Sequence, residues 1–483
     1  MKNILVGIVL IILFAQIVYA LPVFPGAEGF GSETPAGRGG TVYRVTNLNP
    51  SGDGSLRACI QASGPRVCVF EVSGNIPIYG ELAIMNPYIT IAGQTAPSPG
   101  ITLQGTTLGI HTHDVLVQHI RVRTGDSEQG YSPESRDGIK VSGEQDVYNV
   151  VLDHCSISWG VDENIAVTLP GVSDVTVSNC ILSEGLWNSI HPKGGHSMGM
   201  LIGYNVNNIS VIKNLFAHNR GRNPHQSDVK NTIIVNNIVY NSLYDGPVFS
   251  QNNGVQDTKM SAIIGNSHFR GPDSRHAKYM MLVGENVLEP LRLYVDDNEC
   301  ELRTEDPWSC VNNDAPDYVI KETSPPIWVD SITVMPWDEA YEWVLNYSGA
   351  RPADRDSVDE RTVSTVRNRN GSVINSTADV GGWPELAENY EELVLPTNPN
   401  EDDDGNGYTN LEEWLHNYAA IVEGRSTEPP EPLEGDLNED GDVDINDLII
   451  VAANFGSTNA IADTDSNGVI DIFDVVFVAS RFT

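Results

Sequence analysis

The sequence predicts an all-β fold, a right-handed parallel β-helix, followed by a small all-α calcium-binding domain. Two observations support this prediction. A short phrase rich in Val and Ile recurs between residues 110 and 270, and near the C-terminus two twelve-residue loops place oxygen-bearing side chains at regular positions. The first pattern indicates stacked strands, and the second indicates sites for a hard cation.

Each copy of the repeated phrase alternates apolar and polar residues, as a half-buried strand does. Five copies align at one polar position with intervals of 35, 25, 35 and 23 residues: His119, His154, Asn179, Asn214 and Asn237. A strand-rich repeat without helical patterning is typical of a solenoid, whose core forms only when coils stack. We expect the recurrent Asn to bond its equivalents in the coils above and below. The longer intervals should form loops on one face, where sites tend to lie.

The six cysteines fall into three pairs of sequence neighbours, Cys59 with Cys68, Cys155 with Cys180, and Cys300 with Cys310. Pairing neighbours is the simplest of the fifteen possible connectivities. Cys155 and Cys180 hold equivalent places in successive coils, where the strand spacing of about 4.8 Å permits a bridge. They could be bridged or could simply stack as small buried residues.

Composition and hydropathy predict the compartment of the protein and exclude some classes of partner. Residues 1–20 read as a secretory signal peptide because Lys2 precedes a short apolar run that ends in small residues. No later segment is apolar over the roughly 18 residues that a membrane helix needs. We therefore expect a secreted monomer without membrane insertion. The formal charge of -37 also argues against nucleic acid as a partner.

The chain divides into four further parts: the β-helix at 21–320, its C-terminal extension at 321–423, a Pro-rich acidic linker at 424–434, and the calcium-binding domain at 435–483. Within the extension, residues 338–345 and 384–394 look helical. An EF-hand-like loop with an amphipathic segment after it follows at 402–413. Its predicted calcium ligands are Asp402, Asp404, Asn406, Asn410 and Glu413.

The two C-terminal loops start 27 residues apart, at positions 436 and 463, and each has Gly at its sixth position for the sharp turn. The predicted ligands of the first loop are Asp436, Asn438, Asp440, Asp444 and Asp447. Those of the second are Asp463, Asp465, Asn467, Asp471 and Asp474. An apolar run follows each loop, as a short helix would. The pair resembles a type I dockerin, which implies attachment to a cohesin-bearing scaffold protein.

Six motifs stand out within residues 22–420: Phe-Pro-Gly-Ala-Glu-Gly-Phe-Gly at 24–31, Asp-Gly-Ile at 137–139, Asp-His-Cys-Ser at 153–156, His-Ser-Met-Gly-Met-Leu-Ile-Gly at 196–203, Arg-Asn-Pro at 222–224 and Gly-Gly-Trp-Pro at 381–384. Together they resemble polysaccharide lyase family 1, the pectate lyases. The resemblance implies a right-handed β-helix. It also implies a calcium-dependent enzyme that cleaves pectate, or polygalacturonate, by β-elimination to 4,5-unsaturated oligogalacturonides.

The resemblance also implies roles for individual residues. Arg222 maps to the catalytic base in the family's Arg-x-Pro-Arg pattern; because an arginine has a solution pKa of about 12.5–13.8, such a base demands alkaline pH or a strongly perturbed environment. The catalytic calcium would be held by Asp126, Asp137, Asp162 and Glu163. Substrate carboxylates would be held by Lys193, His196, Arg220 and His225.

This chain departs from the family pattern at three places. His225 replaces the second Arg of the pattern. The second calcium carboxylate falls on Ala166, so Glu163 is the candidate to replace it. Lys193 and His196 compete for the place of the substrate-binding lysine. Two alternatives remain open at this point: a polygalacturonase-type hydrolase on the same fold, with Asp162 and Glu163 as acid and base, and a non-catalytic pectate-binding β-helix protein.

Overall fold

The computed structural model describes residues 21–196, 198–244, 246–251, 258–274, 278–425, 437, 445–457, 462, 464 and 468–481. The predicted signal peptide lies outside the described residues, as does the predicted linker from residue 426 onward. Seven predicted calcium ligands also lie outside them: Asp436, Asn438, Asp440, Asp444, Asp463, Asp465 and Asn467.

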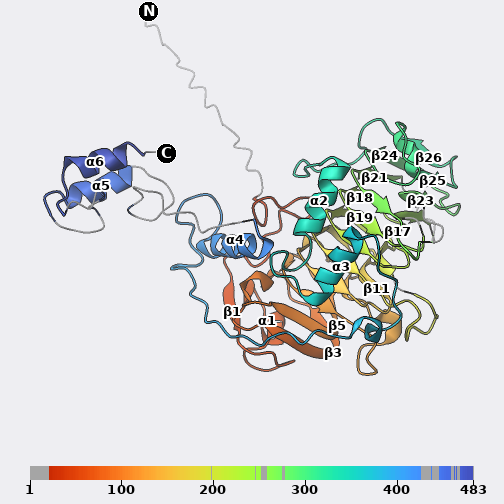
Figure 1. Ribbon diagram of the computed structural model, residues 1–483, viewed down its shortest axis with the longest axis horizontal. Coiled ribbons are helices and arrows are strands. Elements are labelled where there is room, and N and C mark those ends of the chain that lie inside the picture. The colour runs from red at the N-terminus through yellow and green to blue at the C-terminus, as the bar shows by residue number, and fades with distance from the viewer. Residues whose placement is uncertain are drawn as a thin grey trace, which may run out of the picture.

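The described chain from β1 to β26 is a parallel β-helix, as predicted, and its strands stack side by side along the long axis (Figure 1). All the strand pairs of its ladders are parallel, and the coils follow one another in chain order. One sheet has eleven strands: β1 Thr41–Val45, β2 Arg66–Phe70, β4 Ile89–Ala92, β6 Val115–Gln118, β9 Val150–Asp153, β12 Ser173–Ser178, β15 Asn207–Ile212, β18 Asn231–Val235, β21 Lys259–Ile264, β24 Leu291–Asp296 and β26 Val319–Lys321.

Within the described residues the second sheet has fifteen strands and divides into two rows at β5 (Ile101–Ile110), which pairs with β3 (Gly74–Ile84) and with the first strand of each row. One row contains β7 Arg121–Arg123, β10 Ser156–Ser158, β13 Ile181–Ser183, β16 Leu215–Ala217, β19 Ile238–Tyr240 and β22 Ser267–Phe269. The other row contains β8 Ile139–Ser142, β11 Glu163–Thr168, β14 Met198–Gly203, β17 His225–Ser227, β20 Val248–Ser250, β23 Met281–Val283 and β25 Val311–Asn313. A coil therefore presents three strands around a buried apolar core.

The predicted asparagine ladder is present at the turn that follows the strands of the first sheet. The amide of Asn214 donates to Asn237 Oδ1 at 2.9 Å, Asn237 donates to Asn266 at 2.9 Å, and Asn266 donates to Asn298 at 3.0 Å. Each side chain thus ties one coil to the next at the turn, beside backbone bonds such as that from the Ile238 N–H to the Asn214 carbonyl.

One of the repeat alignments is wrong by one residue. Ser178 pairs with Ile212, so Lys213 lies beside Asn179, and Asn214 lies beside Cys180. The phrase that ends at Asn214 holds an additional residue, which the polar pattern alone does not reveal. Two columns therefore run side by side: an inner one that contains the ladder, and an outer corner column in which His119, His154, Asn179 and Lys213 adopt positive φ.

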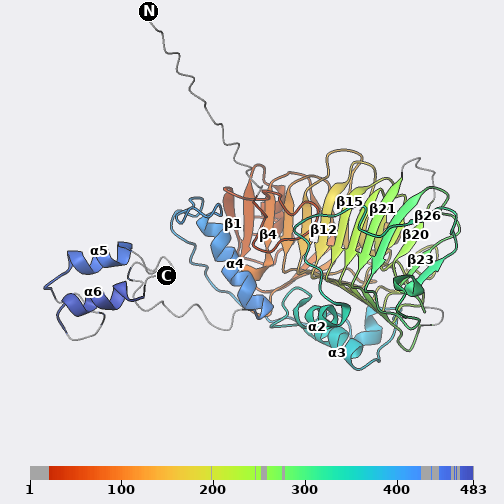
Figure 2. The same cartoon turned by 90° about the horizontal axis from the view of Figure 1, so that it is seen from above.

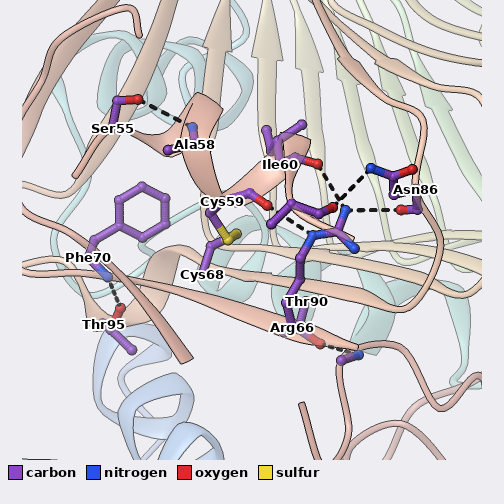
Figure 3. Close-up of a disulfide and its surroundings, with 12 residues drawn as sticks. Ser55, Ala58, Cys59, Ile60, Arg66, Cys68, Phe70, Asn86, Thr90 and Thr95 are labelled. Atoms are coloured by element: carbon purple, nitrogen blue, oxygen red, sulfur yellow. Dashed lines mark hydrogen bonds between the residues drawn. A yellow bond between two sulfur atoms is a disulfide. The ribbon is translucent and has the colours of Figure 1, made fainter. Parts of the chain in front are cut away.

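Two of the three predicted cysteine pairs are disulfides. The Cys59–Cys68 bridge ties the short helix α1 (Leu56–Gln61) to β2 near the N-terminal end of the β-helix (Figure 3). The second bridge joins Cys300 to Cys310. Cys155 and Cys180 are free and buried, and they stack in successive coils, with the Cys155 N–H 3.3 Å from Cys180 Sγ.

The C-terminal extension wraps the β-helix with helices α2 (Trp337–Tyr347), α3 (Ser357–Arg367) and α4 (Asn410–Glu423) (Figure 2). Apolar residues of α2 and α3 pack on the row of β13, β16 and β19, and those of α4 pack on β2 and β4. A capping box between Thr409 and Glu412 starts α4, and Gly424 in the left-handed conformation ends it. Short 3₁₀ turns occur at Gly93–Thr95, Pro133–Ser135, Pro307–Cys310 and Thr377–Val380.

The extension differs from its prediction in two places. The helix expected at 338–345 is present as α2, but residues 384–394 are not helical. That segment runs extended beside the β-helix, where the Ser73 N–H donates to the Asn389 carbonyl and the Glu391 N–H donates to the Glu71 carbonyl. These bonds satisfy the backbone in place of helical ones. Helix α3 was not predicted.

The two apolar runs near the C-terminus form helices, as expected: α5 (Ile445–Ala453) and α6 (Ile472–Ala479). They share a small apolar cluster that includes Val451, Ile470 and Val478. Among the described residues, no helix is both long and apolar enough to cross a membrane.

Candidate active site

Four of the loops that connect the two rows of the second sheet project at the same corner of successive coils. They span residues 124–138, 159–162, 184–196 and 218–224. The two long ones fall in the two long repeat intervals, as predicted. Because parallel coils are about 4.8 Å apart, residues at the ends of these loops come together although they are far apart in the sequence.

Three of the four predicted catalytic calcium ligands meet here. Carboxylate oxygens of Asp137, Asp162 and Glu163 lie within 4.8 Å of one another, and the Glu163 N–H donates to Asp137 Oδ1 at 3.0 Å. Asp137 and Glu163 are 2% exposed. Burial, together with the charge of Asp162, raises the pKa of Asp137 to about 6. Burial and the charge of Asp137 raise the pKa of Glu163 well above its ordinary value.

The raised pKa values of Asp137 and Glu163 indicate that the negative charges of this cluster repel one another. A divalent cation would relieve the repulsion. The donor atoms are all carboxylate oxygens, the ligands that calcium prefers. The cluster therefore fits calcium, with Asp137, Asp162 and Glu163 as the residues that would hold it.

Arg222 lies beside this cluster and forms an ion pair with Glu163 Oε1 through Nη1. Its backbone has a positive φ of 56°, and its carbonyl accepts a hydrogen bond from the Met200 N–H at 2.6 Å. The backbone of Arg222 is thus anchored to the neighbouring coil, while its side chain remains partly exposed, at 28%.

Two stacked imidazoles hold the remaining side of the cluster. His196 Nε2 lies 2.8 Å from Asp162 Oδ1, and His191 Nε2 lies 3.6 Å from the same oxygen. The two rings are parallel, with centroids 3.9 Å apart. Burial alone would raise the pKa of Asp162, but the hydrogen bond and charge of His196 hold it below its ordinary value. His191 was not predicted, although it stands five residues before His196 in a segment rich in polar residues.

The other predicted substrate ligands surround the cluster with different exposure. Lys193 is exposed, and its N–H donates to His191 Nδ1 at 3.1 Å. Arg220 donates to the Gly195 carbonyl at 3.0 Å and lies over the ring of Tyr244.

His225 is partly buried, and its Nε2 is 2.7 Å from Ser250 Oγ. Burial, with a smaller effect from the Arg222 charge, lowers the pKa of His225 to about 4. His225 is therefore neutral at physiological pH, so it cannot supply the charge of the arginine that it replaces.

The structure does not bring Asp126 into the carboxylate cluster. Asp126 Oδ1 accepts a hydrogen bond from Thr377 Oγ1 at 2.8 Å, so this side chain ties loop 124–138 to the C-terminal extension. Asp126 stands thirteen residues before β8, whereas Asp137 stands two residues before it. Only Asp137 is held near the cluster by the strand.

The EF-hand-like loop brings some of its predicted ligands together. Asn406 Nδ2 donates to Asp404 Oδ2 at 2.7 Å and to Glu413 Oε1 at 2.6 Å. Asp402 accepts from the Gly405 and Gly407 N–H groups at 2.8 and 2.9 Å. Asn410 instead donates to the carbonyls of residues 397 and 398 and to Asp403.

Asp447, Asp471 and Asp474 are the predicted C-terminal ligands within the described residues. The Leu437 N–H donates to Asp447 Oδ1 at 2.7 Å, and the Thr464 N–H donates to Asp474 Oδ1 at 2.7 Å. In both loops the twelfth residue thus accepts from the second, so the two loops are closed in the same way. Asp471 caps α6 by accepting from the Phe473 N–H at 2.8 Å.

Comparison with known proteins identifies the family. No family model matches the chain. The chain is 34% identical over 421 residues to "Probable pectate lyase C" of Aspergillus flavus, which covers 82% of this chain and 94% of that protein. It is 33% identical over 432 residues to the protein of the same name from Neosartorya fischeri, with 83% and 95% covered.

Among solved structures, the crystal structure of jun a 1, the major allergen from cedar pollen, matches with a TM-score of 0.44 and 19% identity, covering 66% of this chain and 92% of that one. The curated relatives, at this identity and coverage, show that the chain belongs to the pectate lyase family and is a polysaccharide lyase.

Proposed function

We propose that this chain is a secreted, calcium-dependent pectate lyase that cleaves polygalacturonate by β-elimination and releases 4,5-unsaturated oligogalacturonides. The observation that carries the proposal is the contact between Arg222 and Glu163, which is one of three clustered carboxylates at one corner of the β-helix. The family membership reported above supports the reaction class. The two disulfides support an oxidising compartment outside the cytoplasm.

The residues have distinct tasks in this proposal. Asp137, Asp162 and Glu163 hold calcium, which when bound supplies positive charge that offsets repulsion between enzyme and substrate carboxylates and makes the C5 proton more acidic. An arginine acts as a base only in its uncharged form, so Arg222 gives up a proton to solvent, exchanges its contact with Glu163 for the substrate and removes the C5 proton. The C4–O4 bond then breaks, the 4,5 double bond forms, and the departing 4-oxygen takes up a proton from solvent, so no water is consumed.

The cationic side chains around the cluster bind the galacturonate carboxylates. Lys193 and Arg220 supply charge at the rim. His196 has two tasks in this proposal, because it contacts Asp162 and also binds a substrate carboxylate. His225 contributes a neutral hydrogen-bonding group, so we propose that this subsite tolerates an uncharged or methylated sugar better than one lined by arginine.

The test uses purified protein with polygalacturonate and with methylated pectin, in calcium or in excess chelator. We expect an ultraviolet-absorbing unsaturated product that requires calcium. Release of reducing ends without ultraviolet absorbance would indicate hydrolysis and would refute the proposal. Full activity in chelator would refute the role of calcium.

We also propose that residues 402–413 bind a structural calcium ion. The contacts among Asp404, Asn406 and Glu413 support this assignment, as does the pKa of Glu413, which burial raises with a further contribution from the charge of Asp404. Glu413→Gln should reduce the gain in melting temperature that calcium gives, without changing the calcium dependence of catalysis. An unchanged gain would exclude the loop.

Finally, we propose that residues 435–483 form a dockerin-like module that attaches the enzyme to a cohesin or cell-surface complex. The equivalent closure of the two loops supports a duplicated calcium-binding unit. Five apolar side chains of α5 and α6 are each more than half exposed, which suits a docking face: Ile445, Ile449, Ile472, Phe473 and Val476.

Circular dichroism of residues 435–483 tests the folding of this module. Because so small a unit has little apolar core, metal binding should supply much of its folding free energy, and the peptide should gain helix on adding calcium. Identical spectra with and without calcium would refute the folding claim. Cohesin-recognising dockerins often carry Ser-Thr at the positions that are Ile445-Asn446 and Ile472-Phe473 in this chain. Cohesin binding is therefore a separate measurement, in which wild type is compared with Phe473→Ser.

A further inference from the structure

A second cluster of metal-ligating side chains lies at a different corner of the β-helix from the catalytic one. His119 and His154 occupy the outer corner column, at the turns β6–β7 and β9–β10, and their rings are stacked with centroids 5.1 Å apart. Glu423, the last residue of α4, meets them from the C-terminal extension. One nitrogen of each histidine and one oxygen of Glu423 lie within 4.8 Å of one another. None of the three belongs to the catalytic site.

The hydrogen bonds of the two histidines fix which nitrogens carry protons. His119 Nδ1 lies 2.9 Å from the Ala350 carbonyl, and His154 Nδ1 lies 2.8 Å from Asp153 Oδ2. A carbonyl and a carboxylate can only accept, so both Nδ1 atoms are donors. In the neutral rings, Nε2 therefore carries the lone pair. Metal-binding histidines are typically held in this way, through the nitrogen that does not touch the metal.

The acceptors behind these rings are themselves held in place. Asp153 is 1% exposed and accepts from His154, Gln118, Ser178 and Asn179 at 2.8 to 3.1 Å. With all these donors on its two oxygens, Asp153 orients His154 and has little capacity left to bind an ion directly. The arrangement of a carboxylate behind a histidine is a common support for zinc ligands.

His119 Nε2 is buried and makes no hydrogen bond. It faces Glu423 Oε1 at 3.3 Å. The same oxygen is 3.6 Å from His154 Nδ1, which is the nitrogen that donates to Asp153, so His154 would bind an ion through Nε2. Glu423 is 2% exposed, and its other oxygen, Oε2, pairs with Arg425. A bare nitrogen lone pair that faces a carboxylate is unfavourable unless a proton or a metal ion lies between them.

The separation of His119 Nε2 and Glu423 Oε1 favours the metal ion. A charge-assisted hydrogen bond between nitrogen and oxygen is about 2.7–2.9 Å long. Two ligands that each lie about 2.0–2.1 Å from a tetrahedral zinc ion are about 3.3–3.4 Å apart. The observed 3.3 Å matches the second value. Two imidazoles and one carboxylate suit zinc and its neighbours in the first transition row, whereas calcium prefers six to eight oxygens.

We propose that His119, His154 and Glu423 form a binding site for a divalent transition-metal ion, zinc by its donor set, which fastens the end of α4 to the β-helix. Glu423 also lines a pocket of about 430 Å³, together with Gln118, His416 and Arg425. Water from that pocket can supply the fourth ligand. The site joins residues that are 304 positions apart, Glu423 and His119, immediately before the chain continues toward the C-terminal helices.

The experiment uses the full-length protein, first dialysed against chelator and then titrated with zinc while calcium is kept in large excess to occupy the oxygen-rich sites. Bound zinc per chain is measured by mass spectrometry after gel filtration, and the melting temperature is measured with and without zinc. Cobalt serves as a spectroscopic substitute, because nitrogen ligands give its visible absorption a tetrahedral signature. His119→Asn and Glu423→Gln are the test variants. Asp162→Asn is the matched control, since it removes the other cluster that contains histidine.

We expect wild type and Asp162→Asn to bind one zinc ion that raises the melting temperature. In His119→Asn and Glu423→Gln, zinc affinity should fall by at least about 100-fold. Loss of a residue that only supports a metal ligand lowers the affinity by about 10–100-fold, so a larger loss indicates a direct ligand. Lyase activity of Glu423→Gln verifies that this variant folds. Wild type that binds no zinc, or binding that survives in both test variants, would overturn the proposal and leave His119 and Glu423 as a proton-linked ion pair. Loss of zinc only in Asp162→Asn would also overturn it.

Discussion

At the scale of single residues, the active site depends on charges that cannot all be satisfied by the protein alone. Asp137 and Glu163 are buried beside Asp162, and the only guanidinium that touches these carboxylates among the described contacts is that of Arg222. His191 and His196 take up one oxygen of Asp162. Asp137 Oδ1 accepts from the Glu163 N–H. The cluster still holds more carboxylate oxygens than cationic partners, so it suits a cation, and Arg222 is close enough to act on what the cation would hold.

Replacing Arg222 tests the base directly. Arg222→Lys keeps a positive charge near Glu163 but alters the reach and shape of the group that removes the proton. We expect turnover to fall by roughly 10²–10⁴-fold, the range for loss of a general base, with the melting temperature and calcium affinity nearly unchanged. Steady-state kinetics on polygalacturonate measure this. Arg270→Lys, at a surface pair with Glu301, is the control. Activity of Arg222→Lys within tenfold of wild type would remove Arg222 from the mechanism.

The raised pKa of Asp137 predicts how the metal-free enzyme responds to pH. The folded pKa of about 6 exceeds the unfolded value of about 3.9, so the folded state binds the proton more tightly. This stabilising contribution is complete below about pH 4 and is lost as pH rises through 6. With a shift of about two units, the contribution is roughly 3 kcal/mol.

The measurement compares wild type with Asp137→Asn in chelator by urea unfolding from pH 4 to pH 8. The stability of wild type relative to Asp137→Asn should fall by roughly 3 kcal/mol across that range, and calcium should restore much of it at the high end. Calcium affinity should increase with pH over the same window, because the ion competes with the proton. A pH-independent difference between the two proteins would show that Asp137 does not titrate as described.

At the scale of elements, the repeat predicted the strands and the two long loops, because alternation and spacing are local properties of the sequence. It did not predict the register between β12 and β15, where one phrase holds an additional residue. The extended run at 384–394 was also missed, because its conformation depends on bonds to Glu71 and Ser73, more than 300 residues earlier. Asp126 was misplaced for a similar reason: its contact with Thr377 lies in a segment that the repeat does not include.

The asparagine ladder should be a major source of stability for the coils. Asn237 is buried, donates to Asn266 and to the carbonyls of Val211 and Val235, and accepts from Asn214. Asn237→Ala leaves several buried polar groups without hydrogen-bond partners. Each unsatisfied buried group costs about 1–3 kcal/mol of folding free energy. We expect a loss of roughly 3–5 kcal/mol by urea unfolding. Asn368→Ala, on an exposed side chain, should change stability by less than about 0.5 kcal/mol; equal effects of the two would contradict a special role for the ladder.

At the scale of the whole molecule, the catalytic residues and the C-terminal helices belong to separate parts of the chain. The described clusters of the active site all come from residues 137–222, and α5 and α6 form their own apolar cluster. A chain that ends after Arg425 should therefore keep lyase activity on soluble pectate within about twofold of the full-length enzyme. It retains Glu423 and hence the end of α4. Activity assays after a folding check by circular dichroism decide this; loss of activity in a folded truncation product would show that the C-terminal part helps to build the site.

The active site takes each of its parts from a different coil: Asp137 precedes β8, Glu163 begins β11, His196 precedes β14 and Arg222 precedes β17. In such an arrangement, the spacing between functional groups is set by the backbone ladder and does not depend on the length of any loop. The parts of loops 124–138 and 184–196 that lie away from Asp137 and from residues 191–196 can therefore lengthen, shorten or change composition over evolutionary time while the reacting groups stay in register. Substrate preference can diverge in small independent steps, one coil at a time, and an engineer could graft these loops between relatives without redesigning the core.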